Sequence, residues 1–291
     1  MISAFDYLAP TTLGELFDLY EKNPSSEFLA GGTDLLVELR NRKPPSLLLD
    51  LKKIDELSGI SSTGEFITIG GTTTINELIE SKIIRDEFPA LYQAASSFGC
   101  YEIRNRATVG GSLAHASPGA EFGPVWAVLE ARISIASKKS RRELPFEQFT
   151  LGPGKTALMP GEIVYSIILP KYNIKTTGMA YMRRARTRGM DLASMNCAVL
   201  VLNSDKPEIR EIRIAFGALA RTPDRPREVE KMLSGCEITA ELMGKAKKIL
   251  YERYSPRATS LRASPEYKKL MAGNLLQILL LKLGLMEDSV K

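Results

Sequence analysis

Two short glycine-rich strings could hold a phosphate group. The first is Gly31-Gly32-Thr33-Asp34, and the second is Gly110-Gly111-Ser112. Paired glycines let backbone N–H groups approach a phosphate closely, and the hydroxyl that follows adds a polar group to the concavity. Each string alone is more typical of a tight turn. Because the two occur in successive α/β segments, we expect one dinucleotide to lie between them.

Other nucleotide motifs fail. A third glycine pair, Gly70-Gly71, is interpreted as a structural turn. No G-x-G-x-x-G follows a predicted strand, so a Rossmann site is not expected. The string Leu151–Thr156 ends like a P-loop, but Phe149 stands where that motif requires its first glycine.

The chain has few residues for His-based or metal-based chemistry. It contains one histidine, His115, so a Ser/His/Asp hydrolase or a His-rich zinc site would depend on that residue alone. We expect His115 to be a buried packing or hydrogen-bonding residue. Cys100, Cys197 and Cys236 are odd in number and far apart, which argues against disulfides and against a metal or iron–sulfur site. No metal ligands or catalytic residues are predicted.

Composition indicates a folded soluble protein. The chain has 291 residues, of which 44% are hydrophobic and 25% are charged. The longest apolar stretch, 275–286, is interrupted by Gln277 and Lys282 and is shorter than the roughly 20 residues that span a membrane. Residues 1–10 lack a secretory signal pattern, so a cytoplasmic location and no membrane span are expected.

The net charge of +5 is concentrated in two basic clusters. One is Lys138, Lys139, Arg141 and Arg142, and the other is Arg183, Arg184, Arg186 and Arg188. Such clusters suit a polyanionic partner. However, 34 acidic residues are interspersed with 39 basic ones, so we favour solvated loops or a local anion site over nucleic-acid binding.

The first 170 residues predict alternating strands and helices. Capping boxes, Thr12 with Glu15 and Thr74 with Glu77, predict two helix starts. Strands are predicted at 27–30, 47–51, 66–69, 132–136 and 163–169, and helices at 35–39, 90–98 and 125–130. The glycine-rich stretch that begins at Arg104 is expected to form turns.

The last third predicts an antiparallel sheet and helices. Strands are expected at 197–202 and 209–217, and helices at 229–233, 240–251 and 264–285. Ser264 with Pro265 marks the start of the final helix. A domain boundary is expected near 171–178.

Several long strings resemble the FAD-binding medium subunit of molybdenum hydroxylases, the group that contains bacterial xanthine dehydrogenase and aerobic carbon monoxide dehydrogenase. They are LAGGTDLL at 29–36, IGGTTTINELI at 69–79, IRNRATVGGSLAHASPGAE at 103–121, LGPGKTAL at 151–158, MDLAS at 190–194, IAFGALARTPDR at 214–225 and LRASPEY at 261–267. The resemblance covers nearly the whole chain. The chain lacks the cysteine-rich insert that is found in family members that reduce aromatic thioesters.

The resemblance implies an α+β protein with two domains. Residues 1–176 would form an FAD-binding domain of the vanillyl-alcohol oxidase type, with α/β subdomains at about 1–55 and 56–176 and FAD between these subdomains. Residues 177–291 would form the flavoprotein C-terminal domain, with an antiparallel sheet and helices.

The resemblance also implies which residues bind FAD. The string Leu29–Leu35 would wrap the pyrophosphate, and the second string would form a facing wall. Phe98 would lie against adenine, Glu121 would accept from a ribose or ribityl hydroxyl, and Arg183 would stand near the flavin ring where relatives often have lysine. The full set is Leu29, Ala30, Gly31, Gly32, Thr33, Asp34, Leu35, Phe98, Thr108, Gly110, Gly111, Ser112, Glu121, Leu158 and Arg183.

The implied function is electron transfer by an oxidoreductase subunit. A large molybdopterin subunit would oxidise the substrate, and a small iron–sulfur subunit would pass the electrons to FAD in this chain. FAD would then deliver them to NAD or another acceptor. The three subunits would form a heterotrimer, and two heterotrimers would form a dimer. One alternative is a self-sufficient flavin-dependent oxidoreductase acting on a small molecule. A further alternative is a nonenzymatic anion-binding or nucleic-acid-binding module.

Overall fold

The computed structural model describes residues 4–187, 191–203, 209–258 and 262–287. Arg188 of the second basic cluster, Met190 and Leu261 lie outside these ranges. The chain forms two compact units. Unit 1 comprises 1–81, 100–117 and 131–170, and unit 2 comprises 82–99, 118–130 and 171–291. No helix within the described ranges is both long and apolar enough to cross a membrane.

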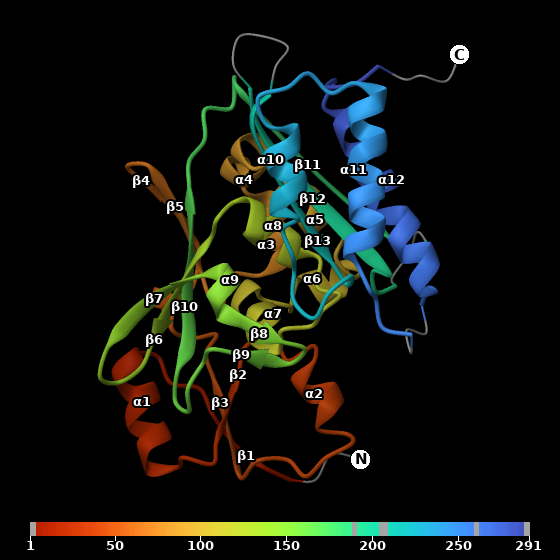
Figure 1. Ribbon diagram of the computed structural model, residues 1–291. Coiled ribbons are helices and arrows are strands. Elements are labelled where there is room, and N and C mark those ends of the chain that lie inside the picture. Colours follow the sequence, from red (N-terminus) through yellow and green to blue (C-terminus); the bar gives the residue numbers. More distant parts are fainter. Residues whose placement is uncertain (1–3, 188–190, 204–208, 259–261, 288–291) are drawn as a thin grey trace. The chain divides into compact units, whose positions relative to one another are not determined.

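Unit 1 contains a small parallel sheet with the strand order β1-β3-β2 (Figure 1). Its strands are β1 (Asp6–Leu8), β2 (Glu27–Leu29) and β3 (Leu47–Asp50). Helix α1 (Leu13–Lys22) begins where the Thr12 hydroxyl accepts from Glu15 N–H at 3.2 Å. It buries Leu16 and Phe17 in one core with Leu49 of β3. The short helix α2 (Leu35–Glu38) follows β2.

Unit 1 also contains a five-stranded antiparallel sheet with the order β4-β5-β10-β6-β7. Its strands are β4 (Ile60–Thr63), β5 (Phe66–Gly70), β6 (Arg132–Ala136), β7 (Arg141–Pro145) and β10 (Ile163–Pro170). The 3-10 helix η1 (Asp55–Leu57) precedes β4. Helix α3 (Ile75–Glu80) follows β5 and begins at the predicted capping box, in which Thr74 and Glu77 bond reciprocally.

The predicted turns after Arg104 are wrong, because this stretch of unit 1 contains helix α7 (Val109–His115). The Thr108 hydroxyl caps it by accepting from Gly111 N–H at 3.1 Å. Side-chain capping and close packing therefore override the low helix propensity of two glycines. The neighbouring short elements are α6 (Tyr101–Arg104), α9 (Phe146–Phe149), β8 (Thr150–Gly152) and β9 (Lys155–Thr156).

Unit 2 is built on a second antiparallel sheet with the order β11-β12-β13. Its strands are β11 (Thr177–Arg184), β12 (Met195–Asn203) and β13 (Ile209–Gly217), and its helices are α4 (Lys82–Glu87), α5 (Pro89–Ser97), α8 (Phe122–Val128), α10 (Arg227–Leu233), α11 (Ala240–Arg253) and α12 (Pro265–Lys282). Cys197, Val199 and Val201 alternate along β12 and share a core with α10, α11 and α12. Asn196, on the opposite face, donates to the carbonyl of Ala120 just before α8.

These elements make the protein α+β, as predicted. The compact units follow packing rather than chain order, because α5 and α8 belong to the first 170 residues but pack on β11–β13. The division at residues 176 and 177, with subdomains at 1–55 and 56–176, stays a prediction.

Candidate cofactor site

The first glycine string forms a loop of unpaired backbone donors in unit 1. β2 ends at Leu29, Gly32 adopts a left-handed φ of 74°, and α2 begins at Leu35. Within the described residues, the five N–H groups of 31–35 donate to no protein acceptor. A left-handed residue inside such a run curves the backbone into an anion-binding concavity. This geometry fits the pyrophosphate role that the sequence predicts.

The second glycine string lies beside this loop but has a different role. The backbone of Gly31 packs on Arg106, because a Cβ on Gly31 would lie 2.0 Å from the Arg106 carbonyl oxygen. A Cβ on Gly111 would lie 3.8 Å from the Ala30 Cβ. The Gly110 N–H donates to the Gly71 carbonyl at 2.9 Å, and the Gly111 N–H donates to Thr108 Oγ1. This string therefore offers a smooth wall and not a set of unused N–H donors.

The third pair, Gly70-Gly71, has the structural role that was predicted. A Cβ on Gly70 would lie 2.3 Å from the Leu57 carbonyl oxygen, and a Cβ on Gly71 would lie 2.2 Å from that of Val164. Both positions are backbone crossings that only glycine permits.

His115 is not buried, which corrects the prediction. Its side chain is 37% exposed at the end of α7. Nδ1 lies 3.4 Å from a carboxylate oxygen of Glu38, and Nε2 lies 3.8 Å from one of Asp34. The histidine thus links α7 to the segment that carries the first loop.

Leu158 follows the β8–β9 hairpin of unit 1, and its N–H donates to Thr156 Oγ1 at 3.3 Å. The hairpin is tied to the end of α7 by a hydrogen bond from Gly154 N–H to the Ala116 carbonyl at 3.0 Å. Leu29–Leu35, Thr108, Gly110–Ser112 and Leu158 therefore all belong to one compact unit.

Asp50 and Lys52 lie beside the first loop and were not predicted to be site residues. Asp50 ends β3, and Lys52 donates both to Asp50 and to the Ala30 carbonyl. One sequence signal could have identified Asp50. It directly follows the apolar run Leu47–Leu49 of β3, and β3 pairs with β2, the strand that leads into the first glycine string.

The remaining predicted residues, Phe98, Glu121 and Arg183, belong to unit 2. The Phe98 ring is half-buried and stacks on Phe122 with centroids 5.6 Å apart. Phe122 in turn stacks on Trp126 at 5.5 Å. Phe98 is thus part of an aromatic row within its own unit, and its contact with adenine stays a prediction.

Glu121 and Arg183 form a buried ion pair. Arg183 Nη1 lies 3.3 Å from Glu121 Oε1, and the two side chains are 11% and 6% exposed, respectively. Arg183 Nη1 also donates to the Asp191 carbonyl. Separate cofactor contacts were predicted for these two residues, and their contact with each other was not. Those contacts stay predictions.

The environment of Glu121 disfavours its charged form. Burial outweighs the opposing effects of a backbone hydrogen bond and of Arg183, and it raises the pKa of this carboxyl from 4.5 to about 7. Tyr181, whose hydroxyl lies 3.2 Å from Asn196 Nδ2, is also buried nearby, and burial raises the pKa of its phenol as well. Glu121 is therefore poised to exchange a proton near neutral pH.

Replacing Glu121 with glutamine should remove a pH dependence of stability. Between about pH 4.5 and 7 the folded chain binds more protons than the unfolded chain, so the wild-type free energy of unfolding should fall as pH rises through this window. At roughly 1.4 kcal/mol per pH unit, the loss is about 3 kcal/mol. Urea unfolding of the cofactor-free chain at several pH values measures it. An equal loss in Glu121→Gln would contradict this account.

Three of the four residues of the first basic cluster form ion pairs within unit 1. Lys138 pairs with Asp18 and Glu21 at 2.8 and 2.6 Å. Arg141 and Arg142 pair with Glu56 and Glu162, respectively. In the second cluster, Arg186 pairs with Asp191 at 3.4 Å. These pairs favour the predicted solvated-loop interpretation over a surface for nucleic acid.

Comparison with known proteins identifies the family. Residues 3–172 match the model of the FAD binding domain in molybdopterin dehydrogenase, and residues 180–283 match that of the CO dehydrogenase flavoprotein C-terminal domain. The xanthine dehydrogenase FAD-binding subunit of Escherichia coli O157:H7 is 30% identical over 270 residues, which is 92% of each chain. The carbon monoxide dehydrogenase medium chain of Hydrogenophaga pseudoflava is 33% identical over 275 residues, which is 94% of each chain.

The structural comparison agrees. The chain is similar to one in a solved carbon monoxide dehydrogenase from Hydrogenophaga pseudoflava that lacks the Mo-pyranopterin moiety, with a TM-score of 0.91, 32% identity and 98% of each chain covered. The predicted resemblance, the two-domain α+β fold and the FAD cofactor are thereby confirmed. The chain belongs to the FAD-binding subunits of the molybdenum hydroxylase family, which are oxidoreductase flavoproteins.

Proposed function

We propose that this chain relays electrons within a molybdenum hydroxylase, with FAD as the carrier. It would receive them from iron–sulfur clusters on a small partner subunit and deliver them to NAD or another acceptor, while a large molybdopterin subunit oxidises the substrate. End-to-end likeness to dehydrogenase FAD subunits supports this role.

The FAD-binding part of the proposal depends on residues 31–35, whose five backbone N–H groups have no acceptor among the residues that the structure describes. In this proposal they bind the pyrophosphate oxygens, and the Gly110–Ser112 wall limits access of water on one side. Bound FAD supplies the redox chemistry. The protein's task is to bind and orient it and to set its electrostatic surroundings, which demands no acid/base dyad.

Arg183 and Glu121 are proposed to tune those surroundings. A guanidinium favours nearby negative charge, and a carboxyl that titrates near pH 7 can be neutral or charged. Protonation of Glu121 would remove the negative charge that faces the Arg183 guanidinium. The direct contacts of both side chains with FAD are part of the proposal.

The electron-transfer role is tested with the FAD-loaded chain and its purified small subunit. We expect the reduced small subunit to bleach the visible flavin absorbance, and NAD or another acceptor to restore it. Purines, aldehydes and N-heterocycles added to the isolated chain should leave the absorbance unchanged. Direct bleaching by such a substrate would instead support the self-sufficient oxidoreductase, and no bleaching by the small subunit would refute the relay.

A further inference from the structure

Three side chains in unit 1, those of Tyr7, Asp50 and Lys52, form a hydrogen-bonded series that reaches the Ala30 carbonyl of the first glycine loop. Lys52 Nζ lies 2.7 Å from both carboxylate oxygens of Asp50 and 3.0 Å from the Ala30 carbonyl oxygen. The Tyr7 hydroxyl donates to Asp50 at 2.5 Å. The Lys52 ammonium has three donors, and these three contacts use them.

Asp50 is a rigid and charged anchor for this lysine. It ends β3, is 3% exposed and also accepts from the backbone N–H of Lys52 at 2.9 Å. Burial by itself would raise its pKa, but the hydrogen bonds from Lys52 and Tyr7 outweigh burial and lower the pKa. The carboxylate therefore holds Lys52 firmly at neutral pH.

The contact with Ala30 fixes the direction of the next N–H group. In a planar trans peptide, the carbonyl of one residue and the N–H of the following residue point in opposite directions. Because the Ala30 carbonyl points at Lys52, the Gly31 N–H points away from Lys52. Gly31 is the first of the five residues whose N–H groups have no acceptor among the described residues.

We propose that Lys52 is a positioning residue for FAD: anchored by Asp50, it holds the Ala30–Gly31 peptide so that the Gly31 N–H faces the pyrophosphate. The inference rests on the proposed pyrophosphate site. Lys52 acts through the loop and not by contacting the phosphates, since its donors are already occupied. The proposed role therefore differs from direct electrostatic attraction between the lysine and the phosphates.

The test compares three variants by FAD titration and by the amide NMR signal of Gly31 in the FAD-free chain. Lys52→Met keeps the apolar stem but removes the donors, and we expect FAD affinity to fall by about tenfold or more. The double variant Asp50→Asn with Lys52→Met removes both charges and avoids a buried unpaired carboxylate. It should fold with higher stability than the single variant, yet bind FAD as weakly.

Lys138→Met is the matched control, since Lys138 also contacts two carboxylates in unit 1 but lies in the β6–β7 hairpin. It should leave FAD affinity and the Gly31 signal unchanged. Wild-type affinity in the double variant, or an unmoved Gly31 signal in both Lys52 variants, would overturn the positioning role. Failure of the wild-type chain to bind FAD would instead count against the proposed pyrophosphate site.

Discussion

Replacing Gly32 with valine is expected to reduce FAD affinity by on the order of a hundredfold while the chain still folds. Gly32 has a φ of 74°, which a β-branched residue strongly disfavours. Its Cβ would also lie 3.1 Å from Leu29 Cδ1 and Leu36 Cδ1. Relief of this strain would rotate the loop and turn its N–H donors away. Loss of two hydrogen bonds to a charged group, at about 1.5 kcal/mol each, accounts for the expected loss.

Gly64→Val is the matched control for backbone strain. Gly64 has a φ of 55° in the turn between β4 and β5, and a Cβ there would meet open space. Both variants should lose about 1–3 kcal/mol of stability, but only Gly32→Val should lose FAD affinity in a fluorescence titration. Equal affinity in the two variants would show that the loop does not hold the cofactor.

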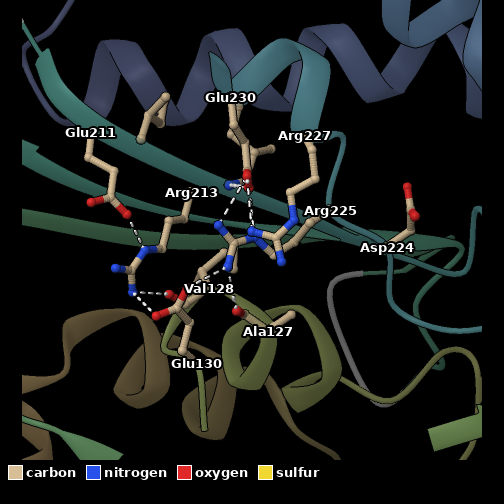
Figure 2. A network of polar contacts seen from close by, with 12 residues as sticks. Ala127, Val128, Glu130, Glu211, Arg213, Asp224, Arg225, Arg227 and Glu230 are labelled. Atoms are coloured by element: carbon tan, nitrogen blue, oxygen red, sulfur yellow. Dashed lines mark hydrogen bonds and ion pairs between the residues drawn. The ribbon is translucent and has the colours of Figure 1, made fainter. Parts of the chain in front are cut away.

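Replacing Arg225 with methionine is expected to cost unit 2 about 3–5 kcal/mol of stability. Figure 2 shows this side chain in a polar network. The guanidinium is 4% exposed and donates to both carboxylate oxygens of Glu230 at 2.8 and 3.0 Å. It also lies 3.2 Å from Glu130. After its removal, the buried Glu230 carboxylate keeps the Ile214 N–H and the exposed Arg227 as partners among the described residues.

Arg227→Met provides the comparison, since its guanidinium is 54% exposed and lies 3.4 Å from the same carboxylate. We expect a loss below about 1 kcal/mol. Urea unfolding of both variants measures the difference. The double variant Arg225→Met with Glu230→Met should regain much of the stability, because no unpaired buried charge remains. Equal losses in the two single variants would refute the network's role.

Much of the fold could be predicted from local signals. The capping residues Thr12, Thr74 and Ser264 each mark a helix start that the structure contains. Apolar runs in the sequence correctly predicted the strands β3, β5, β10 and β13. Strand β11 was missed, because its sequence at 177–184 ends in charged residues and became a strand through pairing with β12. Pairing between distant segments overrides such local patterns.

The candidate site was predicted only in part, because contacts between segments far apart in the sequence also determine its geometry. The glycine strings were visible, but their different roles depend on where each N–H group points. Helix α7 forms because Gly110 packs on Gly71 and Thr108 caps the helix, and neither contact is encoded in the string itself. The Glu121–Arg183 pair joins residues 62 positions apart. Lys52 was overlooked because its importance comes from the adjacent strand and not from a motif.

The visible absorption spectrum of the purified chain shows whether it holds FAD. The purified chain is mixed with FAD and desalted, and the retained cofactor is released and identified by chromatography. We predict a flavin spectrum with stoichiometric FAD. A chain that retains no flavin, both alone and in complex with its partner subunits, would contradict the account.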